Sequence, residues 1–145
     1  MTNSQHINAY KKTQQSSNSV TSSHEIVRTL MKELVNSMKK IVLDIQDDKK
    51  RKQDQYLVNK AFEEKNARHR SKNLSKSLSI IYGLQTSLDF DNALEIANNL
   101  FQLYEYCRHE IIRGFSQKNE DGIIKAIDVV KQIMEGWTEM PSLEN

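Results

Sequence analysis

Apolar residues recur every three or four positions along most of this chain, a spacing typical of one face of an α-helix. The first such stretch begins at Ser22, where the S-x-x-E spacing up to Glu25 predicts a capped helix start. The stripe that follows contains Ile26, Leu30, Leu34, Met38, Ile41 and Ile45. Four more apolar residues widen it, as expected for a helix that packs against two neighbours: Val27, Met31, Val35 and Val42.

Three later stretches repeat the helical pattern. The stretch over residues 74–88 carries Leu74, Leu78, Ile81, Tyr82 and Leu88. The next has one row with Ile96, Leu100, Leu103, Cys107 and Ile111, and a second with Ala97, Phe101, Tyr104, Ile112 and Phe115. The last carries Ile123, Ile127, Val130, Met134 and Trp137. We expect Asp91 or Asn92 to cap the third helix and Pro141 to end the fourth.

The connection over residues 46–73 is less clear, because no glycine or proline interrupts it. The segment QDDKKRKQ (46–53) is a plausible tip between helices, and Asp47 or Asp48 is suited to cap a new helix. A short apolar cluster follows, with Tyr56, Leu57, Val58, Ala61 and Phe62. The stretch is therefore either a helical extension of both neighbours or a small extra helix, and the pattern does not locate the turn.

Four helical patterns joined by short links predict an all-α fold, an antiparallel four-helix bundle with an extended connection between its first two helices. With four glycines and one proline in 145 residues, the chain lacks the turn residues of a sheet protein and any glycine cluster that cradles a phosphate. Residues 1–20 are polar, so we interpret them as a mobile arm before a bundle domain at 21–140 and a tail at 141–145.

Signals of catalysis are weak. The single Cys107 excludes an internal disulfide, and its place on an apolar row indicates a buried, inert thiol. Glu105 and His109 are spaced i, i+4, but no second pair accompanies them, so we predict no metal, no cofactor and no enzyme activity. Tyr104 and Tyr106 cannot both face inward, and an exposed tyrosine would favour a protein partner.

Charge and hydropathy bear on the partner and the compartment. The net charge of +2 hides a gradient, with nine Lys/Arg against five Asp/Glu over residues 47–72 and five against eleven over 89–145. A solvated surface explains the basic stretch better than nucleic-acid binding, which needs a basic face with aromatic residues between the charges, because the C-terminal half of the chain is acidic. The chain has neither a span-length apolar run nor the apolar core of a secretion signal at its N-terminus. We therefore expect a cytoplasmic protein with no membrane insertion.

Three blocks of sequence carry a resemblance to a known family. SLDF (87–90), EIANNLFQLYEYCRHEII (95–112) and VVKQIMEGWTEM (129–140) resemble the flagellar secretion chaperone family FliS. SSHEIVRTLM (22–31) and LSKSLSIIYGL (74–84) are similar to the first two helices of that family. The chain departs from the family pattern at Asn92-Ala93-Leu94, where a Gly-Gly is usual, at Ser23-His24 in place of Ser-Pro, and in the longer stretch over 47–70.

The resemblance implies a cytoplasmic chaperone that binds the disordered C-terminal segment of flagellin, blocks premature polymerisation and delivers its client to the flagellar export apparatus. It also implies a client groove beside the third helix, and the matched positions are Ile96, Asn99, Leu100, Leu103 and Tyr104. Ile7 and Tyr10 on the arm are expected to lie over that groove. An unoccupied apolar groove is also expected to favour self-association.

Two other classes of function remain open from the sequence. A helical bundle that binds RNA or an acidic partner would use the basic 47–72 region, and its affinity would fall steeply with salt. A bundle enzyme that holds a metal ion is the third alternative, and metal analysis of purified protein would test it.

Overall fold

A computed structural model of the chain describes residues 23–53 and 60–139. These residues form four helices, α2 (Ser23–Gln53), α3 (Lys60–Thr86), α4 (Leu94–Gln117) and α5 (Asp121–Glu139), and the two ranges contain no strand. The predicted all-α bundle is therefore confirmed. The expected arm at 1–20, the tail at 141–145 and Pro141 lie outside the described residues, as do Ile7 and Tyr10.

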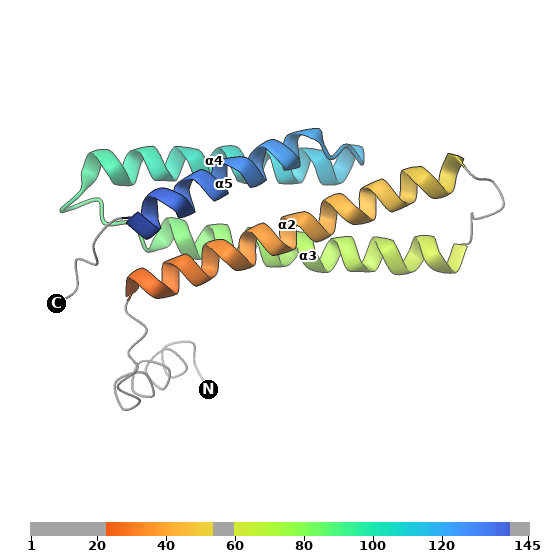
Figure 1. The fold of residues 1–145 in the computed structure, drawn as a ribbon, viewed down its shortest axis with the longest axis horizontal. Helices are drawn as coiled ribbons and strands as arrows, with labels where there is room; N and C mark the ends of the chain where they lie inside the picture. The colour runs from red at the N-terminus through yellow and green to blue at the C-terminus, as the bar shows by residue number, and fades with distance from the viewer. Residues whose placement is uncertain (1–22, 54–59, 140–145) are drawn as a thin grey trace, which may run out of the picture.

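Each helix runs antiparallel to the next, and the four form a ring in which α2 packs against α3 and α5 while α4 packs against α3 and α5 (Figure 1). This up-and-down order brings the start of α2, the 87–93 turn and the end of α5 to one end of the bundle. The α2–α3 hairpin forms the other end and extends beyond α4 and α5 (Figure 1).

The core consists mostly of residues from the apolar stripes that the sequence predicts, although Tyr82, Ile96, Leu103 and Ile112 of those stripes are exposed. In α2, the buried apolar residues are Met31, Leu34, Val35, Met38, Ile41, Val42 and Ile45. The other helices contribute Ile80, Ile81 and Leu84, then Ala97, Tyr104, Cys107 and Ile111, and finally Ile123, Ala126, Ile127 and Val130. Burying this apolar surface provides the main driving force for the fold.

The connection between the first two helices differs from the expected tip. Residues 46–53 are the last turns of α2, and α3 begins at Lys60, so the extension of both neighbouring helices is the correct alternative. The prediction that Asp47 or Asp48 caps a new helix is wrong. Both carboxylates accept hydrogen bonds from the side chain of Asn66 on α3, at 2.8 Å and 3.0 Å.

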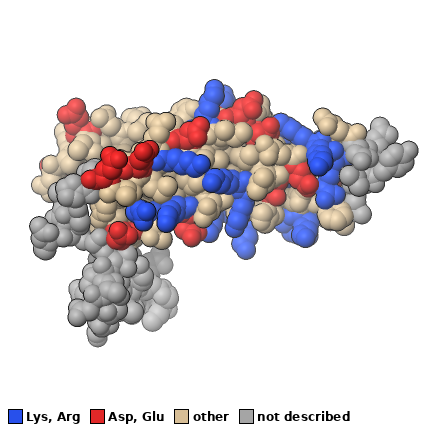
Figure 2. Space-filling view, viewed as in Figure 1, with Lys and Arg blue, Asp and Glu red and all other residues tan. Residues whose placement is uncertain are grey.

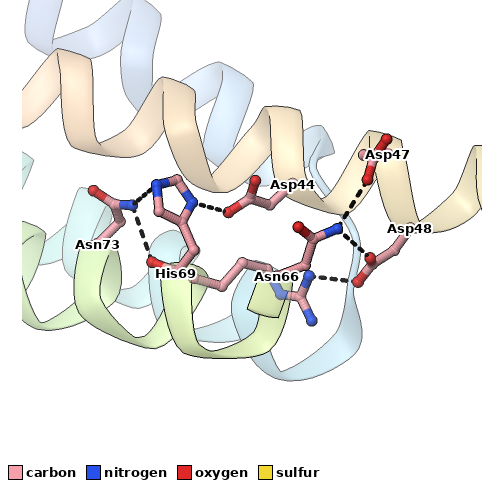
Figure 3. A network of polar contacts seen from close by, with 7 residues as sticks. Asp44, Asp47, Asp48, Asn66, His69 and Asn73 are labelled. Atoms are coloured by element: carbon pink, nitrogen blue, oxygen red, sulfur yellow. Dashed lines mark hydrogen bonds and ion pairs between the residues drawn. The ribbon is translucent and has the colours of Figure 1, made fainter. Parts of the chain in front are cut away.

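These contacts belong to a polar network that joins α2 and α3 where the apolar stripe ends (Figure 3). Asp48 pairs with Arg70, and both side chains are less than one-tenth exposed. One turn nearer the core, Asp44 contacts His69, and Asn73 donates to the His69 carbonyl at 3.0 Å. Polar pairing thus replaces apolar packing in the outer half of the hairpin.

One helix face is rotated relative to its predicted stripe, and the two tyrosines of α4 point as predicted. Tyr82 is 69% exposed, and the neighbouring positions Ile80, Ile81 and Leu84 face the core in its place. Of the two tyrosines on α4, Tyr104 is buried and Tyr106 is 38% exposed, which confirms that they point to different sides. Within the described ranges, no helix is long and apolar enough to cross a membrane.

Candidate functional site

An apolar groove of about 270 Å³ opens at the end of the bundle where the 87–93 turn lies. All four helices and this turn contribute to it. The lining residues are Val27, Leu84, Ser87, Leu88, Asp89, Asn92, Ala93, Ile96, Ala97, Leu100, Tyr104 and Trp137. Ligand sites of this kind are concave and mostly apolar with a few polar groups at the rim, so we take the groove as the candidate site.

Helix α4 forms one wall through residues at helical spacing. Ala97 and Tyr104 are buried at the base of the groove, whereas Leu100 is half-buried. Burial raises the pKa of the Tyr104 phenol well above its ordinary value, so this side chain stays neutral. Ile96 lies at the rim and is 53% exposed, which leaves most of its side chain available to a ligand.

The rim of the groove is shaped by Asp89. Its carboxylate accepts hydrogen bonds from the backbone N–H groups of Asp91 and Asn92, at 3.2 Å and 3.0 Å, and from the Asn92 amide at 3.0 Å. The Asn92 backbone N–H contributes most to lowering the pKa of Asp89. The expected capping by Asp91 or Asn92 is wrong, because Ala93 occupies the N-cap position of α4 without a side-chain cap. Asp89 instead closes the 87–93 turn that precedes this N-cap position.

The opposite wall contains Trp137, which is half-buried near the end of α5. Its indole stacks on the imidazole of His24, with ring centroids 4.9 Å apart and planes at 11°. The indole N–H donates to the His24 carbonyl at 2.9 Å, and His24 Nε2 lies 2.6 Å from the Trp137 carbonyl. The start of α2 and the end of α5 are therefore joined directly beside the groove.

The structure brings together three of the expected site residues and separates others. Ile96, Leu100 and Tyr104 line the groove. Asn99 and Leu103 do not line it; both lie exposed on α4, in the same helical row as Ile96 and Tyr106. We call Ile96, Leu103 and Tyr106 the outer α4 row, and its apolar side chains extend the apolar surface away from the groove.

Sequence reasoning missed part of the lining. Val27, Leu88 and Trp137 were expected only as residues of the apolar stripes, and Leu84 was not among the predicted stripe residues. The available signal was topological, because an antiparallel bundle places the starts of the first and third helices beside the ends of the second and fourth. Apolar residues at those four helix ends were therefore candidates for a shared site.

Charge is distributed unevenly over the surface. Eight Lys/Arg accompany five Asp/Glu on α2, and six accompany two on α3, whereas α4 and α5 together carry four against seven. In Figure 2, basic side chains are spread over the face with acidic ones between them and do not form one continuous patch. At the hairpin end, a cleft of about 390 Å³ is lined by five basic residues, three acidic residues and Ala67: Arg51, Lys52, Lys60, Arg70, Lys118, Asp48, Glu63 and Glu64.

The other residues that the sequence offered as candidates for catalysis or metal binding take part in packing or in ion pairs. Cys107 is fully buried, as predicted, and burial raises the pKa of its thiol to about 12. Glu105 pairs with Arg108 and accepts from the Gln85 amide at 2.9 Å, so it does not pair with His109. Among residues 23–53 and 60–139, no cluster of His, Cys, Asp and Glu is arranged to hold a metal ion.

Comparisons with known proteins agree with the quoted motifs. A family model described as "Flagellar protein FliS" matches residues 6–144. A protein of Vibrio cholerae serotype O1, named "Flagellar secretion chaperone FliS", is 26% identical over 81 residues, which cover 56% of this chain and 60% of that protein. No solved structure gives a significant match.

Proposed function

The chain belongs to the FliS family of flagellar proteins, and from that premise we propose that it is a flagellar secretion chaperone whose client is flagellin. The C-terminal segment of flagellin binds in the apolar groove and along the outer α4 row. The chaperone acts in the cytoplasm, without catalysis, and hands its client to the flagellar export apparatus. The observation that supports this assignment most directly is the groove itself, whose α4 wall is formed by residues of the block 95–112.

The size and position of the groove suit a client that is unfolded before binding. A volume of about 270 Å³ accommodates a few apolar side chains, and the outer α4 row offers further contacts with a segment that continues past the groove. A disordered segment can cover such a spread surface and become ordered only on binding. Its ordering opposes the gain from burial, which leaves an affinity compatible with release at the export apparatus.

The first experiment is a calorimetric titration of this protein with a peptide from the flagellin C-terminus encoded in the same genome. Burial of apolar surface should give one-to-one binding with a negative heat-capacity change. Ile96→Asp should weaken binding at least tenfold, because a carboxylate at the apolar rim must lose water when the client binds. Leu43→Asp is the matched control, since Leu43 is 62% exposed on α2 and is not part of the groove. Equal binding by both variants and the wild type would refute the groove as the site.

The N-terminal arm is proposed to cover the groove when no client is bound, through Ile7 and Tyr10. The chain joins the bundle at Ser23, next to the His24–Trp137 contact that borders the groove. Because a covering arm competes with the client, deletion of residues 1–15 should leave affinity unchanged or increase it. A large loss of affinity would mean instead that the arm contacts the client.

The cleft at the hairpin end supports a second candidate function, binding of RNA or of an acidic partner. Lys52, Lys60 and Lys118 approach it from three parts of the chain, although Glu63 and Glu64 lie among them. Titration with a polyuridine RNA over a range of salt concentrations tests this candidate, because phosphate contacts make affinity fall steeply with salt. Weak RNA binding that Lys52→Glu does not change would eliminate RNA as a ligand of this cleft. A polyglutamate peptide serves as the probe for an acidic partner.

A further inference from the structure

His24 and Trp137 form a closed pair of contacts across the start of α2 and the end of α5. Each residue gives one polar contact to the backbone of the other, at 2.6 Å and 2.9 Å, and the two rings stack. We infer that His24 is a positioning residue that fixes the indole of Trp137 as the α5 wall of the groove and thereby sets client affinity. The part that concerns the client rests on the proposed function.

The chemistry of both contacts supports this role. Trp137 lies in the last turn of α5, where backbone carbonyls lack a partner within the helix. A carbonyl only accepts, so His24 Nε2 carries the proton and satisfies it. The indole N–H is donated in the opposite direction, to the His24 carbonyl.

The stacked imidazole supplies what these bonds alone do not provide. The bond from the indole to the backbone carbonyl at position 24 is available to any residue there, whereas the ring stack and the Nε2 contact need the histidine side chain. Stacking at 4.9 Å with nearly parallel planes restricts rotation of the indole, and a fixed wall lowers the ordering cost when a client binds. Loss of the imidazole should therefore loosen Trp137 before it affects the rest of the fold.

A neighbouring contact provides a matched control. Arg28 Nε donates to Thr138 Oγ1 at 3.1 Å and so joins the same two helix ends through side chains other than those of the aromatic pair. Thr138→Val removes this link and leaves the aromatic pair in place. If His24 merely fastened α2 to α5, the two substitutions would have similar effects on the groove.

The test uses intrinsic fluorescence, because Trp137 is the only tryptophan of the chain. In client-free, full-length protein, acrylamide quenching of the indole should increase towards that of free tryptophan in His24→Ala. It should remain at the wild-type level in Thr138→Val. His24→Gln, which retains a donor for the Trp137 carbonyl but loses the stack, should be intermediate and provides a folded variant should the alanine variant unfold.

Client affinity is the second measurement. Binding of the flagellin C-terminal peptide should weaken about tenfold in His24→Ala, as expected for the loss of one stacked pair and one hydrogen bond, and less in His24→Gln. Unchanged quenching in both His24 variants would overturn the inference whatever the client does. Increased quenching with unchanged affinity would overturn its link to the client. If the wild type binds no flagellin peptide, the proposed function fails, and quenching alone then decides whether His24 positions Trp137.

Discussion

Replacing Asp48 with alanine should destabilise the bundle through the hairpin end. The Asp48 and Arg70 side chains are 8% and 6% exposed, and their ion pair joins α2 to α3 beyond the apolar core. Asp48→Ala leaves the Arg70 guanidinium without its buried counter-charge. Asn66 is less affected, because it retains its 2.8 Å bond to Asp47.

The magnitude follows from burial of the pair. Breaking a buried ion pair by removing one partner costs about 3–5 kcal/mol. Arg70 lines the cleft of about 390 Å³ and can reach water there, which places the expected loss near the lower limit, about 3 kcal/mol. With a urea dependence of about 2 kcal/mol per M, the unfolding midpoint should fall by about 1.5 M.

Urea unfolding followed by circular dichroism measures this loss, and the same two helices provide its control. Glu33 and Lys76 also join α2 to α3, at 2.8 Å, but their side chains are 47% and 46% exposed, so Glu33→Ala should be hard to distinguish from wild type. The double variant Asp48→Leu/Arg70→Met should recover most of the stability, because it leaves no unpaired charge. Equal losses in Asp48→Ala and Glu33→Ala, or no recovery in the double variant, would refute the reasoning.

Three further predictions concern single sites. Gly114→Ala should lower the free energy of unfolding in urea by about 1–3 kcal/mol, because a Cβ there would lie 2.6 Å from Ile123 Cγ1 and 2.7 Å from the Asn119 carbonyl oxygen. Gly83→Ala, with open space around its Cβ, is the control and should cause no loss. Cys107, with a pKa of about 12, should resist alkylation at neutral pH until urea unfolds the protein. Arg108 and Gln85 hold the pKa of Glu105 at about 2, below its ordinary 4.5. The contribution of Glu105 to stability is therefore present above pH 4.5 and is lost as pH falls towards 2, so the stability difference between wild type and Glu105→Gln should shrink over that interval.

The four helices were predictable because each has an apolar stripe and a neighbour that buries it. The stripes do not fix which residues at the stripe margins are buried, because a helix in a four-membered ring contacts only two others. Ile96 and Leu103 fit the same apolar row as Cys107 and Ile111, yet only the latter two are fully buried. Their exposure depends on where α5 lies against α4, which is a tertiary property.

The hairpin end was not predictable from apolar periodicity, because polar side chains hold it together. Asp44, Asp48, Asn66, His69 and Arg70 pair across α2 and α3, and in the sequence they look like an ordinary solvated stretch. Pairing of this kind depends on the register between the two helices, which the amino-acid sequence alone does not reveal. A charged segment without glycine or proline was nevertheless a sign that both helices continue.

The groove was predictable only in part, because its residues come from four helix ends that lie together only in the folded chain. Its α4 wall lies in 95–112, one of the blocks that resemble the FliS family, whereas Val27 and Trp137 had no local signal apart from their places in the stripes and Leu84 was not in a predicted stripe. The antiparallel order of the helices, once accepted, predicts which ends meet.

The two ends of the bundle therefore have different physical characters. The hairpin end is joined by polar side chains paired with one another, so a substitution there should act on stability through α2 and α3. The groove end leaves Ile96 partly exposed and relies on the His24–Trp137 contact to hold its α5 wall. The proposed chaperone function, in which a client is retained and then released, would benefit from this separation, because client binding can reshape one end while the hairpin and the central core keep the fold intact. Asp48→Ala should accordingly lower the urea midpoint and leave client affinity of the folded protein unchanged. Ile96→Asp should instead lower client affinity and leave the urea midpoint unchanged.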